Sequence, residues 1–135
     1  MRFNIITIFP KIFDSYFSES IIKRAREKKL VEIFVHNLRD FAQDKHKKVD
    51  DSPYGGGPGM VLKIEPMARA IGSILANRSP SKLFIKKFGG QESQIANPKK
   101  TKIILFSAIG KQFDQKMARD FAKKYDRVVM IAGHY

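Results

Sequence analysis

The sequence predicts one α/β domain, built on a mainly parallel sheet with helices on both faces. Three observations support this class. The chain has 135 residues, enough for a single core that buries roughly two-thirds of the unfolded surface. Segments of strand character alternate with segments of helical periodicity. The strands are also apolar on both faces, which is typical of strands covered by helices.

Four apolar runs are predicted strands. They cover residues 2–9, 31–36, 102–107 and 127–132. The run at 102–107 is the clearest buried strand of the four, and Gly110 closes it. A further short apolar piece spans residues 60–64, between a glycine-rich loop and a helix.

Helical signals lie between the first two strands. Pro10 suits the first turn of a short helix, because its missing N–H would be unpaired there in any case. Ser18 or Ser20 can cap a further helix that runs to about Lys29, with its basic side chains on one face.

Two longer amphipathic helices are predicted at residues 65–77 and 114–125, the first with Pro66 in its opening turn. Their inward side chains are expected to be Met67, Ala70, Ile71, Ile74 and Leu75 in the first helix and Phe113, Met117, Phe121 and Ala122 in the second. Residues 77–101 contain Gly and Pro breakers, so a mobile insertion or a hairpin is expected there.

The charge of the chain is strongly positive. It has 26 Lys and Arg against 13 Asp and Glu, a formal net charge of +13, which favours a polyanionic partner such as nucleic acid. The alternative is that a lysine-rich surface serves only solubility. The chain has no Cys, no apolar run of membrane-spanning length and no signal peptide at its start, so a cytoplasmic protein is the expectation.

A glycine-rich segment at residues 49–60 is the most distinctive stretch. Four of its twelve residues are Gly and two are Pro, so it is expected to be neither helix nor strand. We predict a shaped loop whose glycines supply positive φ and which Pro53 and Pro58 stiffen. Its backbone N–H groups could bind an anion. It is not a P-loop, because Met60 and Val61 stand where that motif has Lys and Ser or Thr.

Charged residues flank this loop. Lys45, Lys47 and Lys48 are candidates for contact with phosphates. Asp50 and Asp51 could supply a general base, although paired acids before Ser-Pro more often hold a turn together. The three histidines do not form a spaced metal site, and no nucleophilic triad is legible.

Small residues follow two of the predicted strands, at residues 106–110 and 132–135. In open parallel sheets, ligands bind beyond the carboxyl ends of the strands, so backbone groups at these two ends could hold an adenine edge or a ribose. The alternative is that Gly and Ser simply form turns there.

Residues 46–60 closely resemble the signature loop of the bacterial tRNA (guanine-N1)-methyltransferase (TrmD) family. Further segments fall in that family's order and spacing: residues 5–10 with Phe13, 39–41, 106–111 and 133–135. The resemblance covers nearly the whole chain.

The resemblance implies an SPOUT-class methyltransferase whose α/β domain contains a trefoil knot. It implies methyl transfer from S-adenosyl-L-methionine to N1 of guanosine 37, beside the tRNA anticodon, by a homodimer. The residues that would line the adenosine pocket are Leu105, Phe106, Ser107 and Ala108, with Gly133 and Tyr135 on its other wall. The residues that would lie by the cofactor and the target guanine are Tyr54, Gly55, Gly56, Gly57, Pro58 and Gly59.

Two residues depart from the family pattern: Ala108 stands in place of Pro, and His134 in place of Arg. In the family, the chain continues beyond Tyr135 into the rest of the knot and a helical C-terminal domain, which bears the aspartate assigned as the base at guanine N1. The resemblance therefore implies that residues 1–135 are an N-terminal, incomplete methyltransferase domain, inactive alone. The alternative is a non-catalytic, basic RNA-binding module.

Overall fold

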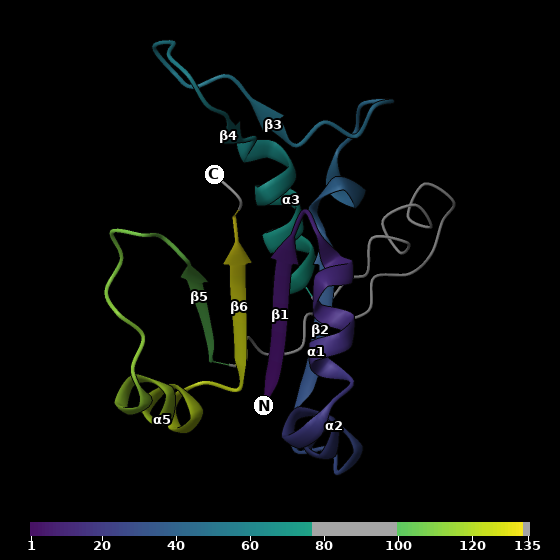
Figure 1. The fold of residues 1–135 in the computed structure, drawn as a ribbon, viewed down its shortest axis with the longest axis vertical. Coiled ribbons are helices and arrows are strands. Elements are labelled where there is room, and N and C mark those ends of the chain that lie inside the picture. Colours follow the sequence, from purple (N-terminus) through teal and green to yellow (C-terminus); the bar gives the residue numbers. More distant parts are fainter. Residues whose placement is uncertain (77–99, 134–135) are drawn as a thin grey trace. The chain divides into compact units, whose positions relative to one another are not determined.

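A computed structural model describes residues 1–76 and 100–133 of the chain (Figure 1). These residues fall into two compact parts, each described by itself. One part comprises residues 1–37 with 100–133, and the other comprises residues 38–76. The expected insertion lies mostly outside the described residues, as do His134 and Tyr135.

The first part contains a four-stranded sheet of order β2-β1-β6-β5. Its strands are β1 (Arg2–Thr7), β2 (Glu32–Asn37), β5 (Thr101–Leu105) and β6 (Arg127–Ala132). Every pairing in this sheet is parallel, which confirms the parallel sheet expected from the apolar runs. The α/β class is confirmed with it.

The two central strands carry the core of this part. Ile5 and Ile6 are both buried although their side chains point to opposite faces, so both faces of the sheet are covered at β1. Val128 and Val129 of β6 are buried in the same way. These residues belong to strands that the sequence predicted. Each of the two strands has apolar side chains on both faces and so packs against a layer on either side.

Strand β5 differs from the prediction of a clearly buried strand. It lies at an edge of the described sheet, with β6 as its neighbour. The side chain of Ile103 is 42% exposed and that of Leu105 is 67% exposed. An apolar run fixes strand character, but the position of the strand within the sheet decides its burial.

Helices η1 (Pro10–Phe13), α1 (Asp14–Phe17) and α2 (Ser20–Glu27) connect β1 to β2. Pro10 lies in the first turn of η1, as predicted. The predicted serine cap of α2 is wrong: its N-cap residue is Glu19, without a side-chain cap hydrogen bond. The Ser18 hydroxyl instead donates to the carbonyl of Asp14 at 2.6 Å, so it serves the preceding helix.

Helix α5 (Gln115–Lys124) connects β5 to β6. Phe121 packs its ring against those of Phe113 and Tyr125, with centroids 5.9 and 5.5 Å apart. Phe113 is nevertheless half exposed and Ala122 is exposed, so only part of the expected inward face is buried.

Asp114 caps α5, because its Oδ1 accepts a hydrogen bond from the backbone N–H of Met117 at 2.7 Å. We expect Asp114→Ala to destabilise the fold by about 1 kcal/mol, the usual cost of losing such a cap. Urea unfolding measures this loss. The nearby Asp120→Ala, within the helix, is the matched control and should cost less; equal losses would contradict a capping role.

The second part consists of η2 (Leu38–Phe41), β3 (Asp50–Asp51), β4 (Val61–Leu62) and α3 (Ile64–Leu75). Pro66, Ala70, Ser73 and Ile74 are the buried residues of α3. Leu75, expected to face inward, is 46% exposed, because it lies at the last position of the helix. The guanidinium Nε of Arg69 donates to the carbonyl of Phe41 at 2.8 Å and ties α3 to η2.

His36, on β2, makes the fold sensitive to acid. Its Nε2 lies 3.0 Å from the side-chain oxygen of Asn4, and burial lowers the pKa of His36 below its ordinary value of 6.5. The folded state therefore binds a proton less readily than the unfolded state does. The contribution of neutral His36 to the free energy of unfolding is therefore fully present above the pKa of the unfolded state. It is lost as the pH falls from there through the pKa of the folded state.

We expect urea midpoints to fall as the pH is lowered below about 6.5, the ordinary pKa of histidine. His36→Gln, which keeps a hydrogen-bonding group without the titration, should flatten that part of the profile. His46→Gln, at an exposed histidine, is the control. An unchanged slope in His36→Gln would contradict the assignment.

Candidate functional site

The glycine-rich segment is the loop of a β-hairpin. Asp50 pairs with Leu62 and Asp51 with Val61 in antiparallel register. The expectation that residues 49–60 contain no strand is therefore wrong for Asp50 and Asp51, and the loop proper spans residues 52–60. Pairing with an apolar partner strand overrides the low strand propensity of aspartate.

The base of this hairpin is anchored on both sides. Val49 is fully buried, and its carbonyl accepts a hydrogen bond from the backbone N–H of Lys63 at 2.8 Å. The Lys63 ammonium also lies 3.9 Å from a carboxylate oxygen of Asp51. The other carboxylate oxygen of Asp51 accepts from the backbone N–H of Ser52 at 2.9 Å. Asp51 thus stabilises the start of the loop, which is the structural role that the sequence offered as an alternative to a general base.

The glycines of the loop adopt positive φ angles, as predicted. Gly55, Gly56, Gly57 and Gly59 have φ values of +87°, +80°, +109° and +104°. A Cβ placed on any of them meets no atom within 4 Å, so the requirement for glycine comes from φ and not from crowding. Tyr54 is 88% exposed beside them. The hairpin loop therefore presents a bare backbone and one exposed aromatic ring.

The three candidate phosphate-binding lysines lie on a turn built by Asp44. Its carbonyl accepts from the backbone N–H of Lys47 at 3.1 Å, and its carboxylate accepts from that of Lys48 at 3.0 Å. The hydrogen bond from Lys48 lowers the pKa of Asp44. The role of Asp44 was not predicted from the sequence, although an Asp in a polar segment is a common turn signal.

Lys45 and Lys48 are exposed, whereas Lys47 is partly engaged: its ammonium lies 3.9 Å from a carboxylate oxygen of Asp40. Lys47 also adopts a positive φ of 51°. Lys45 and Lys48 are therefore the better placed of the three for contact with an external anion.

The second group of candidate residues lies at the carboxyl ends of β5 and β6. Leu105 pairs with Ile131 in the parallel register, and the Phe106 backbone N–H donates to the carbonyl of Ile131 at 3.2 Å. The two strands therefore end at the same edge of the sheet, where Phe106 follows β5 and Gly133 follows β6. The structure thus places Leu105 and Phe106 beside the end of β6, and Tyr135 lies outside the described residues.

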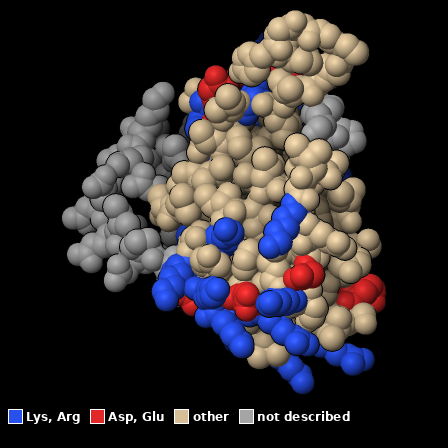
Figure 2. Space-filling view, turned by 90° about the vertical axis from the view of Figure 1, so that its left-hand side faces the viewer, with Lys and Arg blue, Asp and Glu red and all other residues tan. Residues whose placement is uncertain are grey.

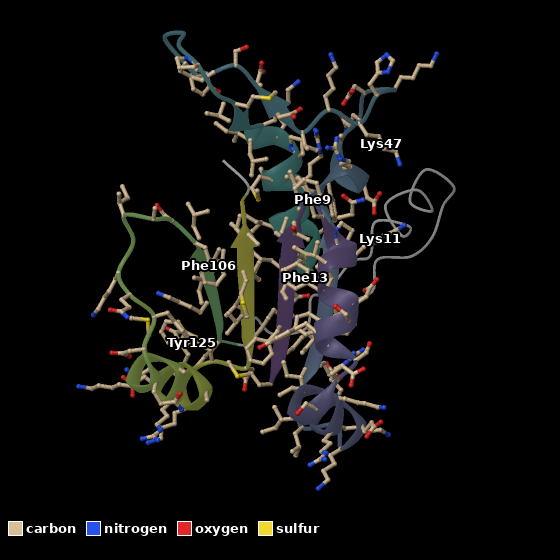
Figure 3. All side chains as sticks on the ribbon, viewed as in Figure 1. Phe9, Lys11, Phe13, Lys47, Phe106 and Tyr125 are labelled. Atoms are coloured by element: carbon tan, nitrogen blue, oxygen red, sulfur yellow. The ribbon has the colours of Figure 1, made fainter. Side chains whose placement is uncertain are left out.

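These strand ends offer an exposed apolar surface next to a tight turn. Leu105 and Phe106 are 67% and 51% exposed, and Figure 3 shows Phe106 just beyond the end of β5. The Gly110 backbone N–H donates to the carbonyl of Ser107 at 3.1 Å, which closes the turn that includes Ala108. A Cβ on Gly110 would lie 3.1 Å from that same oxygen, so a side chain there requires the Ser107 carbonyl to shift by a few tenths of an ångström.

The side chains and backbone groups at these strand ends suit an adenosine group. Exposed apolar side chains suit the faces of a purine ring, and backbone groups of a turn suit its polar edge. The described residues contain no group of three or more His, Cys, Asp or Glu side chains that could hold a metal ion. The glycine hairpin belongs to the other part of the chain, so its approach to these strand ends stays a prediction.

Comparison with known proteins identifies the family. The family model described as tRNA (Guanine-1)-methyltransferase TrmD matches residues 1–135. Curated proteins named tRNA (guanine-N(1)-)-methyltransferase match the whole chain. Those from Dehalococcoides mccartyi and Thermomicrobium roseum are 42% identical to it over 135 residues, and that from Geobacter sulfurreducens is 39% identical.

The chain spans less than half the length of these relatives: 46% for Dehalococcoides and Geobacter and 43% for Thermomicrobium. Among solved structures, the tRNA (m1G37) methyltransferase from Aquifex aeolicus is similar, with 33% identity and a TM-score of 0.66. That match covers 97% of this chain and 50% of the Aquifex chain. The chain therefore belongs to the tRNA (guanine-1)-methyltransferase TrmD family.

Proposed function

We propose that the full-length protein transfers a methyl group from S-adenosyl-L-methionine to N1 of guanosine 37 in tRNA. The observation that carries this proposal is the family match through all of residues 1–135, which includes both strand ends and the glycine hairpin. The name of the Aquifex structure, an m1G37 methyltransferase, supports the same base and position.

The cofactor site proposed here is the carboxyl end of β5 and β6. Leu105 and Phe106 would hold the apolar faces of adenosine, and the backbone of Ser107, Ala108 and Gly133 would hold its polar edges, with Tyr135 as a further wall residue. S-adenosylmethionine supplies an electrophilic methyl group on a sulfonium. The task of these residues is to fix that group in one orientation, which lowers the entropic cost of the reaction.

The substrate site proposed here is the hairpin loop with its lysines. Tyr54, exposed at the loop, offers a surface on which a base can stack, and the glycines and Pro58 leave backbone groups open to it. Lys45 and Lys48, helped by Lys47, would hold backbone phosphates. A guanine in the anticodon region must leave its stack to be reached, and its N1 proton must pass to a general base.

We also propose that the full-length protein is a cytoplasmic homodimer with an SPOUT-type knot and a separate C-terminal helical domain. The family membership supports these features. No helix among residues 1–76 and 100–133 is long and apolar enough to cross a membrane.

The test is methyl transfer by the purified full-length protein. With labelled S-adenosylmethionine, an anticodon stem-loop bearing guanosine 37 should accept the label at N1, and the same stem-loop with adenosine 37 should not. Label on both substrates or on neither would contradict the proposal.

The alternative, a non-catalytic RNA-binding module, is favoured only by the charge of +13. Calorimetry with S-adenosylhomocysteine separates the two. Heat of binding and competition with the methyl donor support the enzyme, whereas RNA binding without either supports the module.

A further inference from the structure

The strands of the sheet begin level with one another. Arg2 is in register with both Glu32 and Arg127, and Arg127 is in register with Thr101. Backbone hydrogen bonds extend this edge: Glu32 N–H donates to the Met1 carbonyl at 3.0 Å, and Asp126 N–H donates to the Lys100 carbonyl at 3.0 Å. This amino edge lies at the opposite ends of the strands from the candidate cofactor site.

The segments that precede β2, β5 and β6 place lysines at the amino edge. Helix α2 ends just before β2 and α5 ends just before β6 (Figure 1). The basic residues at the carboxyl ends of these two helices therefore lie at the amino edge. Five exposed lysines, which we call the amino-edge lysines, result from this arrangement: Lys28, Lys29, Lys100, Lys123 and Lys124. Figure 2 shows Lys and Arg side chains gathered over the lower end of the molecule, where the strands of Figure 1 begin.

Acidic side chains at this edge do not balance the lysines. Glu32 is occupied by Arg2, whose Nε lies 2.7 Å from its carboxylate. Burial, and then the neighbouring positive charge of Arg2, lower the pKa of Arg127. Glu27 and Asp126 are the other acids of the edge, against five exposed lysines. None of the ion pairs found within residues 1–76 and 100–133 involves an amino-edge lysine.

We infer that the amino-edge lysines bind the phosphate backbone of a double-stranded RNA region, at a site distinct from the proposed catalytic one. The inference rests on the proposed function only for the choice of RNA as the partner. Four strands span about 14 Å at the usual strand spacing. A nucleic-acid duplex of that length carries about eight phosphates on its two strands, so phosphates recur along the whole length of this edge.

Lysine is suited to this role, since phosphate contacts position a nucleic acid without reading its sequence. The competing explanation is that basic residues at helix ends only stabilise the helix dipole. That explanation accounts for Lys123 and Lys124 in the last turn of α5, and for Lys28 at the end of α2. It does not account for Lys100, which lies on no helix and precedes β5 at the same edge.

The test compares two triple variants of the full-length protein with equal loss of charge. The first is Lys28→Gln, Lys123→Gln and Lys124→Gln, at the amino edge. The second is Lys11→Gln, Lys111→Gln and Lys116→Gln, at exposed lysines of η1, of the loop after β5 and of the first turn of α5. The probe is a 20-base-pair RNA hairpin without an anticodon loop, titrated at several salt concentrations.

In the plot of log affinity against log salt concentration, we expect the amino-edge triple variant to reduce the magnitude of the slope by about two to three. We expect the control triple variant to leave the slope nearly unchanged. Equal flattening by both triples, or by neither, would overturn the inference. So would a lower urea midpoint with unchanged RNA binding, which is the outcome of a purely dipolar role. Loss of polyglutamate binding with RNA binding retained would assign the surface to an acidic protein instead.

Failure of this inference is distinguishable from failure of the proposed function. Methyl transfer is measured on the unmodified protein with a short anticodon stem-loop. The hairpin titration contains no methyl donor and no target guanosine 37, so each result can be obtained whatever the outcome of the other.

Discussion

Gly57→Ala is expected to lower methyl transfer by the full-length protein about a hundredfold, the scale of loss that follows a misplacement of about 1 Å. Gly57 has φ +109°, and a side chain there meets open space. The variant should therefore keep its fold and change the path of the loop, because L-residues avoid this conformation. Single-turnover methylation measures the loss.

Gly72→Ala is the matched control. Gly72 lies within α3, its φ is not positive, and an added Cβ meets nothing within 4 Å. We expect unchanged methyl transfer and a stabilisation of roughly 0.5–1 kcal/mol. Equal activity of Gly57→Ala and the unmodified protein would contradict a functional role for the loop conformation.

Ile6→Ala is expected to lower the free energy of unfolding by about 2–5 kcal/mol. Ile6 is 1% exposed at the centre of the sheet, in register with His36 on β2 and Ile131 on β6. Its loss leaves a cavity that the two neighbouring strands cannot close. Since domains are stable by only about 5–15 kcal/mol, the variant should unfold at clearly lower urea concentration.

Ile12→Ala removes the same atoms from a side chain that is 65% exposed on η1. Its expected cost is within about 0.5 kcal/mol, as for ordinary surface substitutions. Similar costs for the two variants would show that the core does not lie along β1.

The strands of the sheet could be predicted because burial on both faces leaves a continuous apolar run. The boundaries of β6 agree with the predicted residues 127–132, since every residue of that run from Val128 to Ala132 is apolar. Exposure could not be predicted in the same way. The apolar run of β5 resembles that of β6, yet β5 has one neighbour in the described sheet and β6 has two.

Pairing between short polar segments also escapes sequence patterns. Asp50 and Asp51 form a strand only because Val61 and Leu62 return beside them, and no local periodicity indicates this. The same holds for Asp44, whose two hydrogen bonds shape the lysine turn, and for the N-cap of α2. Such contacts depend on the path of the chain.

The candidate cofactor site was predicted in part by the topology of parallel sheets. Ligands bind where neighbouring strands end, and the register of β5 with β6 brings Phe106 and Gly133 to the same edge. The glycine hairpin was predicted as a loop with positive φ, which its four glycines confirm. Its place beside the cofactor is a prediction that follows from the family alone.

Photoaffinity labelling tests the central claim most directly. An S-adenosylmethionine analogue with an azide on its adenine ring is irradiated with the full-length protein, and the labelled peptides are mapped by mass spectrometry. We predict that the label falls within residues 105–108 or 133–135 and that S-adenosylhomocysteine prevents it. Protectable label confined to other segments would contradict a cofactor pocket at the ends of β5 and β6.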